Sequence, residues 1–167
     1  MQYAHAELTS SIIEAAVEVQ RELGGGFSKE IFKKALCAEL ANEGIDAEVD
    51  ALVPIIYKSE KVGERRLDLS VEGVVCVELE VQPHFKDPDV NHALKHLRAT
   101  GMDAGLVLNF GPCKLDYVRL YVQGCRSDVL IGSSLHHAPE RKNPFSMNGT
   151  AHKFSKRAWL PILRRKN

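Results

Sequence analysis

The sequence predicts a mixed α/β fold in which a β-sheet is flanked by helices. Two helical patterns come first, β-branched runs with alternating polarity follow, and a third helix precedes two further strands. The predicted order of elements is therefore ααβββαββ. With 167 residues, of which 44% are hydrophobic, the chain is long enough for one domain with a buried core. We expect this domain to span residues 1–132 and a basic C-terminal arm to occupy residues 133–167.

Three segments have the patterns of helices. The first helix is expected to be capped by the hydroxyl groups of residues 9–11 and to end at the glycines of residues 24–26. The second begins near Ser28 and stops at Gly44, and its apolar residues recur at helical spacing. The third covers Asp89–Thr100.

Strands are expected where β-branched and aromatic residues gather between turn residues. These runs are Val49–Tyr57, Leu67–Val71, Val74–Val81, Gly105–Phe110 and Leu115–Val122. Pro54 lies within the first run, which indicates an irregular strand or an edge strand. After Gly132 the pattern gives way to polar and basic residues, which indicates an extended arm.

Composition excludes several classes of protein. The longest apolar runs are far shorter than the roughly 20 residues of a membrane span, so we expect a cytoplasmic protein with no membrane partner. The four cysteines are scattered without a C-x-x-C pair, which argues against a zinc knuckle or a disulfide framework.

Acidic residues gather on one face of a predicted β-hairpin from Arg66 to Gln82. Apolar residues alternate with Glu78 and Glu80 on the second strand, and Asp68 lies on the polar face of the first. Like charges this close raise one another's pKa unless a cation or a basic partner neutralises them. Mg²⁺ and Mn²⁺ prefer such oxygen ligands and promote attack on a phosphodiester. The hairpin therefore predicts metal binding by Asp68, Glu78 and Glu80; the alternative is a solvated sheet face.

The register of this hairpin follows from its alternation. A three-residue loop over residues 71–73, with Gly73 left-handed, keeps both apolar faces on the same core, whereas a two-residue turn does not. This register places Asp68 opposite Cys76 and makes Glu78 its diagonal neighbour. Diagonal Cβ atoms lie roughly 7 Å apart, a gap that one divalent ion can bridge.

The hairpin resembles the D-x9-E-x-K signature of PD-(D/E)XK nucleases, whose core is restriction-endonuclease-like. Residues 65–69 and 77–80 carry this likeness, and the sequence is similar, more narrowly, to the GxxExxY family from Glu7 to Phe110. The resemblance implies that Asp68 and Glu78 are metal ligands and that Mg²⁺ or Mn²⁺ is the cofactor.

Two positions depart from this family pattern. Lys29 stands where the family has glutamate, and Glu80 stands where it has the lysine that orients the attacking water. Phe32 replaces the tyrosine of the family's name motif. Some restriction enzymes of the superfamily carry E-x-E and still cleave. Because the two charge changes are reciprocal, Lys29 is predicted to pair with Glu80 or to supply the catalytic ammonium; the alternative is an exposed helix lysine.

Four further residues are candidates for contact with nucleic acid or phosphate. Arg66 and Gln82 lie at the two ends of the hairpin, and His92 and His96 share one face of the following helix. The resemblance places His92 where the family usually has glutamine. Binding of a transition metal by the two histidines is the alternative.

The C-terminal arm is strongly basic. From residue 135 onward it has eight Lys and Arg residues against one acid, a net charge of +7, and residues 1–134 carry −7. The arm also contains Phe145, Phe154 and Trp159. This mixture suits either nucleic-acid binding or docking on another subunit, and assembly into a homo-oligomer or with a partner protein is favoured.

Two functions are compatible with these features. The first is a metal-dependent phosphodiesterase acting on DNA or RNA, with Asp68, Glu78 and Glu80 at the metal and Lys29 or Arg66 facing the phosphate. The second is a non-catalytic subunit that keeps the same fold within a larger assembly.

Overall fold

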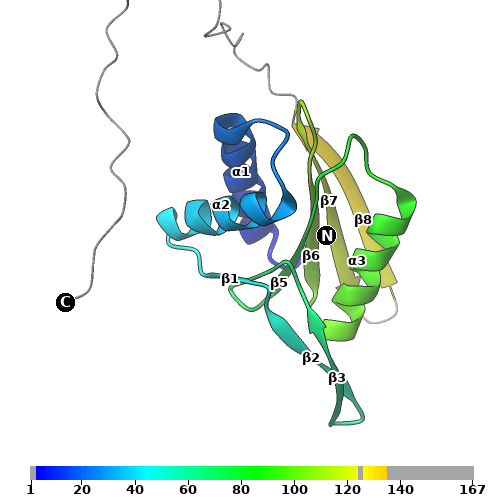
Figure 1. Cartoon of the computed structure of the whole chain (residues 1–167). Helices are drawn as coiled ribbons and strands as arrows, with labels where there is room; N and C mark the ends of the chain where they lie inside the picture. The colour runs from blue at the N-terminus through cyan, green and yellow to red at the C-terminus, as the bar shows by residue number, and fades with distance from the viewer. Residues whose placement is uncertain (1–2, 124–125, 135–167) are drawn as a thin grey trace, which may run out of the picture.

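The computed structural model describes residues 3–123 and 126–134 (Figure 1). Within these residues the elements are α1 (Ala6–Leu23), α2 (Lys29–Asn42), β1 (Ala47–Val49), β2 (Leu52–Tyr57), β3 (Glu60–Arg66), β4 (Leu69–Val71), β5 (Val75–Glu80), α3 (Asp87–Thr100), β6 (Ala104–Phe110), β7 (Leu115–Gln123) and β8 (Arg126–Ser134). The predicted fold class, a mixed sheet flanked by helices, is confirmed.

Six strands form one sheet in the order β1-β4-β5-β6-β7-β8, while β2 and β3 form a separate two-stranded sheet. β5 and β6 are parallel because α3 crosses over between them, and the other neighbours are antiparallel. Helices α1 and α2 cover one face of the large sheet and α3 covers the other (Figure 1).

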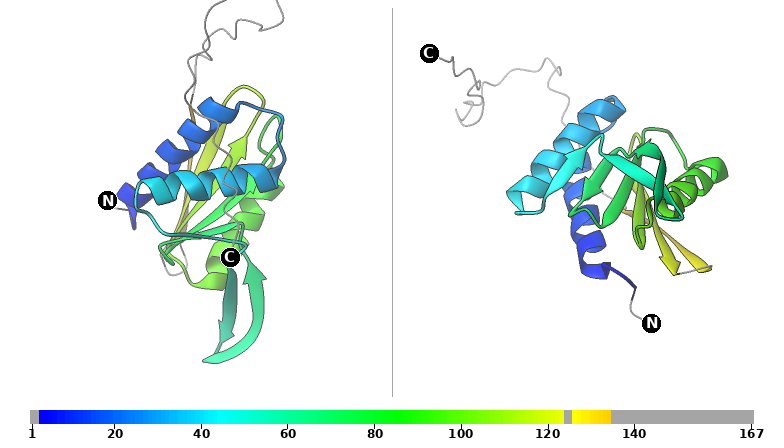
Figure 2. Two further views of the ribbon diagram at one scale, coloured as in Figure 1. Left: turned by 60° about the vertical axis from the view of Figure 1, so that its left-hand side comes forward. Right: turned by 90° about the horizontal axis from the view of Figure 1, so that it is seen from below.

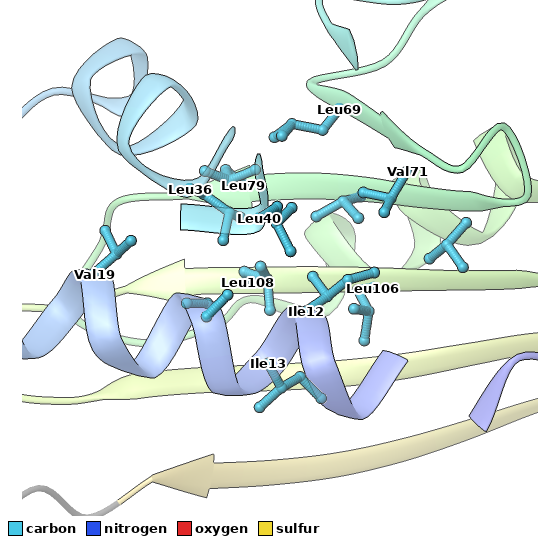
Figure 3. Close-up of a cluster of buried hydrophobic side chains, with 14 of the residues drawn as sticks. Ile12, Ile13, Val19, Leu36, Leu40, Leu69, Val71, Leu79, Leu106 and Leu108 are labelled. Atoms are coloured by element: carbon cyan, nitrogen blue, oxygen red, sulfur yellow. The ribbon is translucent and has the colours of Figure 1, made fainter. Parts of the chain in front are cut away.

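Two hydrophobic cores result from this layering, and β5 contributes to both. Leu79 packs with Ile12 of α1 and Leu36 of α2 in the larger core (Figure 3). Cys76 packs in the smaller core, beneath α3. Because side chains alternate along a strand, Glu78 shares the α3 face with Cys76.

The predicted order contained five strands, and the described residues form eight. The run Val49–Tyr57, expected as one strand, is divided between β1 and β2 in different sheets, since Asp50 adopts a left-handed φ of 57° between them. β3 escaped prediction because it is polar and mostly exposed, in a hairpin with β2 that projects from the body (Figure 2). β8 escaped prediction because three apolar residues among small and polar ones make no clear alternation.

The first helix begins earlier than predicted, at Ala6. The hydroxyl groups of Thr9 and Ser10, expected as caps, donate instead to the Ala6 carbonyl at 2.9 and 3.0 Å. Hydroxyl side chains form this backward bond inside helices as readily as they cap them, so sequence alone did not separate the two roles. The predicted start of the second helix is confirmed, with Ser28 at its N-cap.

The predicted boundary between the domain and the basic arm, at residue 132, falls within β8, and the division of the chain stays a prediction. β8 continues to Ser134, past residue 132, and the basic arm from residue 135 onward lies outside the described residues. None of the helices in the described part is both long and apolar enough for a membrane crossing.

Candidate active site

The β4–β5 hairpin has the predicted parity but a different register. Ser70 faces Cys76, so even positions face even positions as expected, and Gly73 has the predicted left-handed φ of 67°. The loop, however, comprises residues 72–74 instead of 71–73, because Glu72 is also left-handed and the turn starts one residue later. Ser70, and not Asp68 as predicted, is therefore the partner of Cys76, and Asp68 lies in a bend just before β4.

Asp68 and Glu78 are two largely buried carboxyl groups in contact. Each side chain is only 13% exposed, and the Leu79 N–H donates to Asp68 Oδ2 at 2.9 Å. Burial raises the pKa of Glu78 to about 8, together with the charge of Asp68 and a hydrogen bond between the two carboxyls. This concentration of acidic groups is what a divalent cation would neutralise.

Two lysines of α2 approach Asp68 from the face of the sheet that α1 and α2 cover. Lys29 Nζ lies 2.6 Å from Asp68 Oδ2, and Lys33 Nζ lies 3.8 Å from Oδ1. Lys29 therefore forms its ion pair with Asp68, and not with Glu80 as predicted, although its charge also acts on Glu80. Burial raises the pKa of Glu80 more than the Lys29 charge lowers it.

Lys33 is one of two cationic residues at the site that sequence reasoning missed. Its side chain is 3% exposed, and its ammonium lies 2.8 Å from Asp50 Oδ1 and 2.7 Å from Glu30 Oε1. Burial alone lowers the pKa of Lys33, but these two hydrogen bonds and the charge of Asp68 outweigh it and raise the pKa. The sequence feature that could have revealed Lys33 is its spacing from Leu36, which places both residues on the buried face of α2.

The predicted histidines join the site from the α3 side. His96 Nδ1 lies 2.9 Å from Glu78 Oε1, and His92 Nε2 lies 3.0 Å from His96 Nε2. Arg65 Nη2 contacts both Nε2 atoms, at 2.9 Å for His92. Burial, followed by the nearby His92 and Arg65, lowers the pKa of His96 to about 4. Arg65 was not predicted because only the fold brings β3 beside α3.

Gln82 and Arg66, the other two predicted contact residues, lie beside groups other than the Asp68–Glu78 pair. The Gln82 main chain exchanges two hydrogen bonds with the Asn109 side chain, at 3.0 and 2.9 Å, and its amide donates to Asp89. Gln82 thus links β5 to β6 and α3. Arg66 lies near Asp50, whose pKa is lowered mainly by the hydrogen bond from Lys33 and further by charges that include Arg66.

The donor set fits magnesium better than a metal enclosed by protein ligands. No group of three or more His, Cys, Asp and Glu side chains in the described chain is arranged to hold an ion. Mg²⁺ is typically bound by one or two carboxylates, with water and substrate phosphate completing its octahedron. Asp68 and Glu78 would supply these two carboxylates. Glu80 lies on the same strand face, but its metal role stays a prediction.

The layered α/β fold and its buried carboxyl pair define a nuclease-like domain. Residues 6–120 match the model of the PD-(D/E)XK nuclease superfamily, and the chain belongs to this superfamily. Membership indicates nuclease-like phosphodiesterase chemistry at family level, generally supported by a divalent metal such as Mg²⁺ or Mn²⁺.

Other comparisons show only remote likeness. No curated protein matches the sequence significantly. The crystal structure of SSO0001 is similar to 54% of this chain, with 17% sequence identity and a TM-score of 0.40. The match spans 48% of that other chain, about half of its length.

Proposed function

We propose that this protein is a metal-dependent phosphodiesterase of the GxxExxY type that cleaves DNA or RNA. The observation that carries the proposal is the buried Asp68–Glu78 pair with the Lys29 ammonium 2.6 Å from Asp68 Oδ2. Asp68 and Glu78 would hold Mg²⁺ or Mn²⁺. When bound, such an ion polarises the phosphodiester and lowers the pKa of a coordinated water.

Lys29 takes the place of the lysine that position 80 lacks. Its side chain is 38% exposed and long, so its ammonium is free to turn from Asp68 toward a phosphate or an attacking water. Lys33, by contrast, is buried and tied to Asp50 and Glu30, and it holds a constant positive charge behind Asp68. The two lysines therefore have different roles. Lys29 can move toward the substrate, and Lys33 supplies a fixed positive charge close to Asp68.

Metal titration followed by thermal unfolding tests this proposal. We expect Mn²⁺ and Mg²⁺ to raise the Tm of the wild type, and Asp68→Asn to abolish the response. Asp50→Asn is the matched control because it removes a lysine-paired aspartate outside the carboxyl pair, so its metal response should persist. In a nuclease assay, Lys29→Met should lose activity while keeping the metal response. A metal response that survives in Asp68→Asn would contradict the assigned site.

A non-catalytic role is the second candidate, and the contacts of the carboxyls favour it. Lys29 and Lys33 lie on Asp68 and His96 lies on Glu78, so both acids have protein partners without a metal. Such a protein would serve as a binding subunit of a larger assembly. A wild type that shows neither a metal response nor cleavage of DNA or RNA would select this function.

The proposed partners and location follow from the same proposal. Nucleic acid is the substrate, and the basic arm contacts a second copy or a partner protein. We propose a cytoplasmic location, in which the scattered cysteines of the sequence, among them Cys37, Cys76 and Cys113, would stay reduced.

A further inference from the structure

We infer that His96 is a positioning residue for Glu78, and that Arg65 selects the His96 tautomer that this role requires. The inference rests on the proposed function only in treating Glu78 as a metal ligand. It is carried by contacts among three elements, since Glu78 lies on β5, His96 on α3 and Arg65 on β3.

His96 is placed to hold one oxygen of Glu78. The residue is 6% exposed, and its Nδ1 lies 2.9 Å from Glu78 Oε1. Buried polar groups are costly unless hydrogen-bonded, so this contact restricts the rotation of both side chains. The other carboxyl contact of Glu78 is with Asp68. His96 thereby keeps the Glu78 carboxyl in the orientation that brings the two acids together.

The contact with Arg65 decides which ring nitrogen of His96 carries the proton. A guanidinium group has only donors, so a histidine nitrogen that bonds to it must accept. Arg65 Nη2 contacts Nε2 of His96 and lies 2.9 Å from Nε2 of His92, which is itself 3.0 Å from Nε2 of His96. Whether His92 accepts from Arg65 or donates to His96, Nε2 of His96 is an acceptor of the Arg65 N–H. Nε2 of neutral His96 is then unprotonated, and Nδ1 carries the hydrogen.

The consequence concerns the metal ligand directly. With its proton on Nδ1, His96 donates to Glu78 Oε1 and favours a carboxylate that accepts. The opposite tautomer would offer Glu78 Oε1 only a second acceptor. This repels an ionised Glu78 and also a protonated one, because the protonated carboxyl directs its hydrogen to Asp68. Partners of this kind orient ligands in metal sites, and their loss typically lowers metal affinity about 10–100-fold.

Two amide substitutions separate this role from a general packing role. The amide nitrogen of asparagine coincides with Nδ1 of histidine, whereas glutamine reaches the position of Nε2. We therefore expect His96→Asn to retain Mn²⁺ affinity within a few-fold and His96→Gln to lose about 10–100-fold, measured by isothermal titration calorimetry. His84→Asn, which removes an imidazole elsewhere, is the control. Equal affinity in the two His96 variants would overturn the inference.

The tautomer is tested independently of metal by ¹⁵N NMR of the apo protein. We expect a protonated Nδ1 and an unprotonated Nε2 for His96, and a shift toward the other tautomer in Arg65→Met, which keeps bulk but has no donor. A protonated Nε2 in the wild type overturns the inference. If Mn²⁺ does not bind the wild type, the proposed function fails, and the NMR result still decides how His96 contacts Glu78.

Discussion

Glu78 retains its proton to a higher pH than an ordinary glutamate because it is buried beside Asp68. Its pKa is about 8 in the folded chain against an ordinary value of 4.5. Between these two pH values the folded state binds the proton and the unfolded state does not, so folding stability decreases as pH rises. This decrease in stability is complete above about pH 8, and below about pH 4.5 Glu78 does not make the stability depend on pH.

Substitution of Glu78 by glutamine should remove this pH dependence. We expect urea unfolding of the wild type to show a free energy lower at pH 9 than at pH 5 by on the order of 3 kcal/mol from this group, and Glu78→Gln to lack that decrease. Glu14→Gln, at an exposed position of α1, is the control and should retain the wild-type profile. Parallel profiles for wild type and Glu78→Gln would show that Glu78 titrates normally.

The same proton couples metal binding to pH. A cation that binds ionised Glu78 must displace its proton, so affinity should rise up to tenfold per pH unit below about pH 8 and then level off. Calorimetry at pH 7 in two buffers of different ionisation enthalpy should show release of close to one proton. In Glu78→Gln the remaining weak binding should release none, and proton release that persists there would assign the titration to another group.

The chemically distinctive residues of the site were visible in the sequence. Asp68 and Glu78 were found through strand alternation and the signature, and Lys29 through its exchange with the family glutamate. Lys33 and Arg65 were missed for a physical reason: a basic residue looks the same in solvent or in a buried ion pair until the fold supplies its partners. The Arg65 contact joins residues 31 positions apart.

At the level of elements, the loop between α1 and α2 determines where α2 starts and therefore where its first residue, Lys29, lies. A Cβ on Gly25 would lie 2.7 Å from the Cα and the carbonyl oxygen of Pro112, and backbone atoms cannot step aside cheaply. We expect Gly25→Ala to lower the free energy of unfolding by about 1–3 kcal/mol and to weaken activity by displacing the start of α2. Chemical denaturation and the nuclease assay provide the two readouts.

Gly63→Ala is the matched control for this substitution. A Cβ there would meet only the Ile55 side chain at 3.9 Å, an ordinary contact, and its φ needs no glycine. Its stability should change by less than about 0.5 kcal/mol. If the two variants unfold alike, the close approach of the loop to Pro112 does not constrain the chain.

Elements that face the core were predictable, and those that leave it were not. α2 and the β4–β5 hairpin have regular apolar periodicity because one face of each is buried. β3 projects with β2 and has few buried side chains, so selection for burial leaves no pattern in its sequence. The hairpin register was wrong by two residues because alternation fixes parity, while the left-handed Glu72 decides where the turn starts.

Across the whole molecule, the site depends on both layers that cover the sheet. α2 brings Lys29 and Lys33 to Asp68 from one face, and α3 brings His96 to Glu78 from the other. The two acids therefore lie between the lysines of α2 and the histidine of α3. This division explains why the acids were predictable from a local hairpin, whereas their partners required the complete fold.

Charge is divided unevenly along the chain, between an acidic N-terminal part and the basic arm. Residues 1–134 carry −7 and the remaining residues carry +7, so electrostatic attraction favours an arm that binds an acidic body, its own or that of a second copy. If the arm joins copies, the molar mass from light scattering should fall as NaCl rises from about 50 mM to about 500 mM, because salt screens the attraction.

Neutralising three terminal charges tests the arm in the full-length protein. We expect the variant Arg164→Gln, Arg165→Gln and Lys166→Gln to dissociate at lower salt than the wild type, with unchanged affinity for DNA and RNA. An arm that binds nucleic acid would behave differently: the molar mass would stay the same, and the slope of log K against log salt would decrease by about 0.7–0.9 per lost contact. Because the three substitutions lie far in sequence from Asp68 and Glu78, the metal-induced Tm shift should be the same in both proteins and serves as the control.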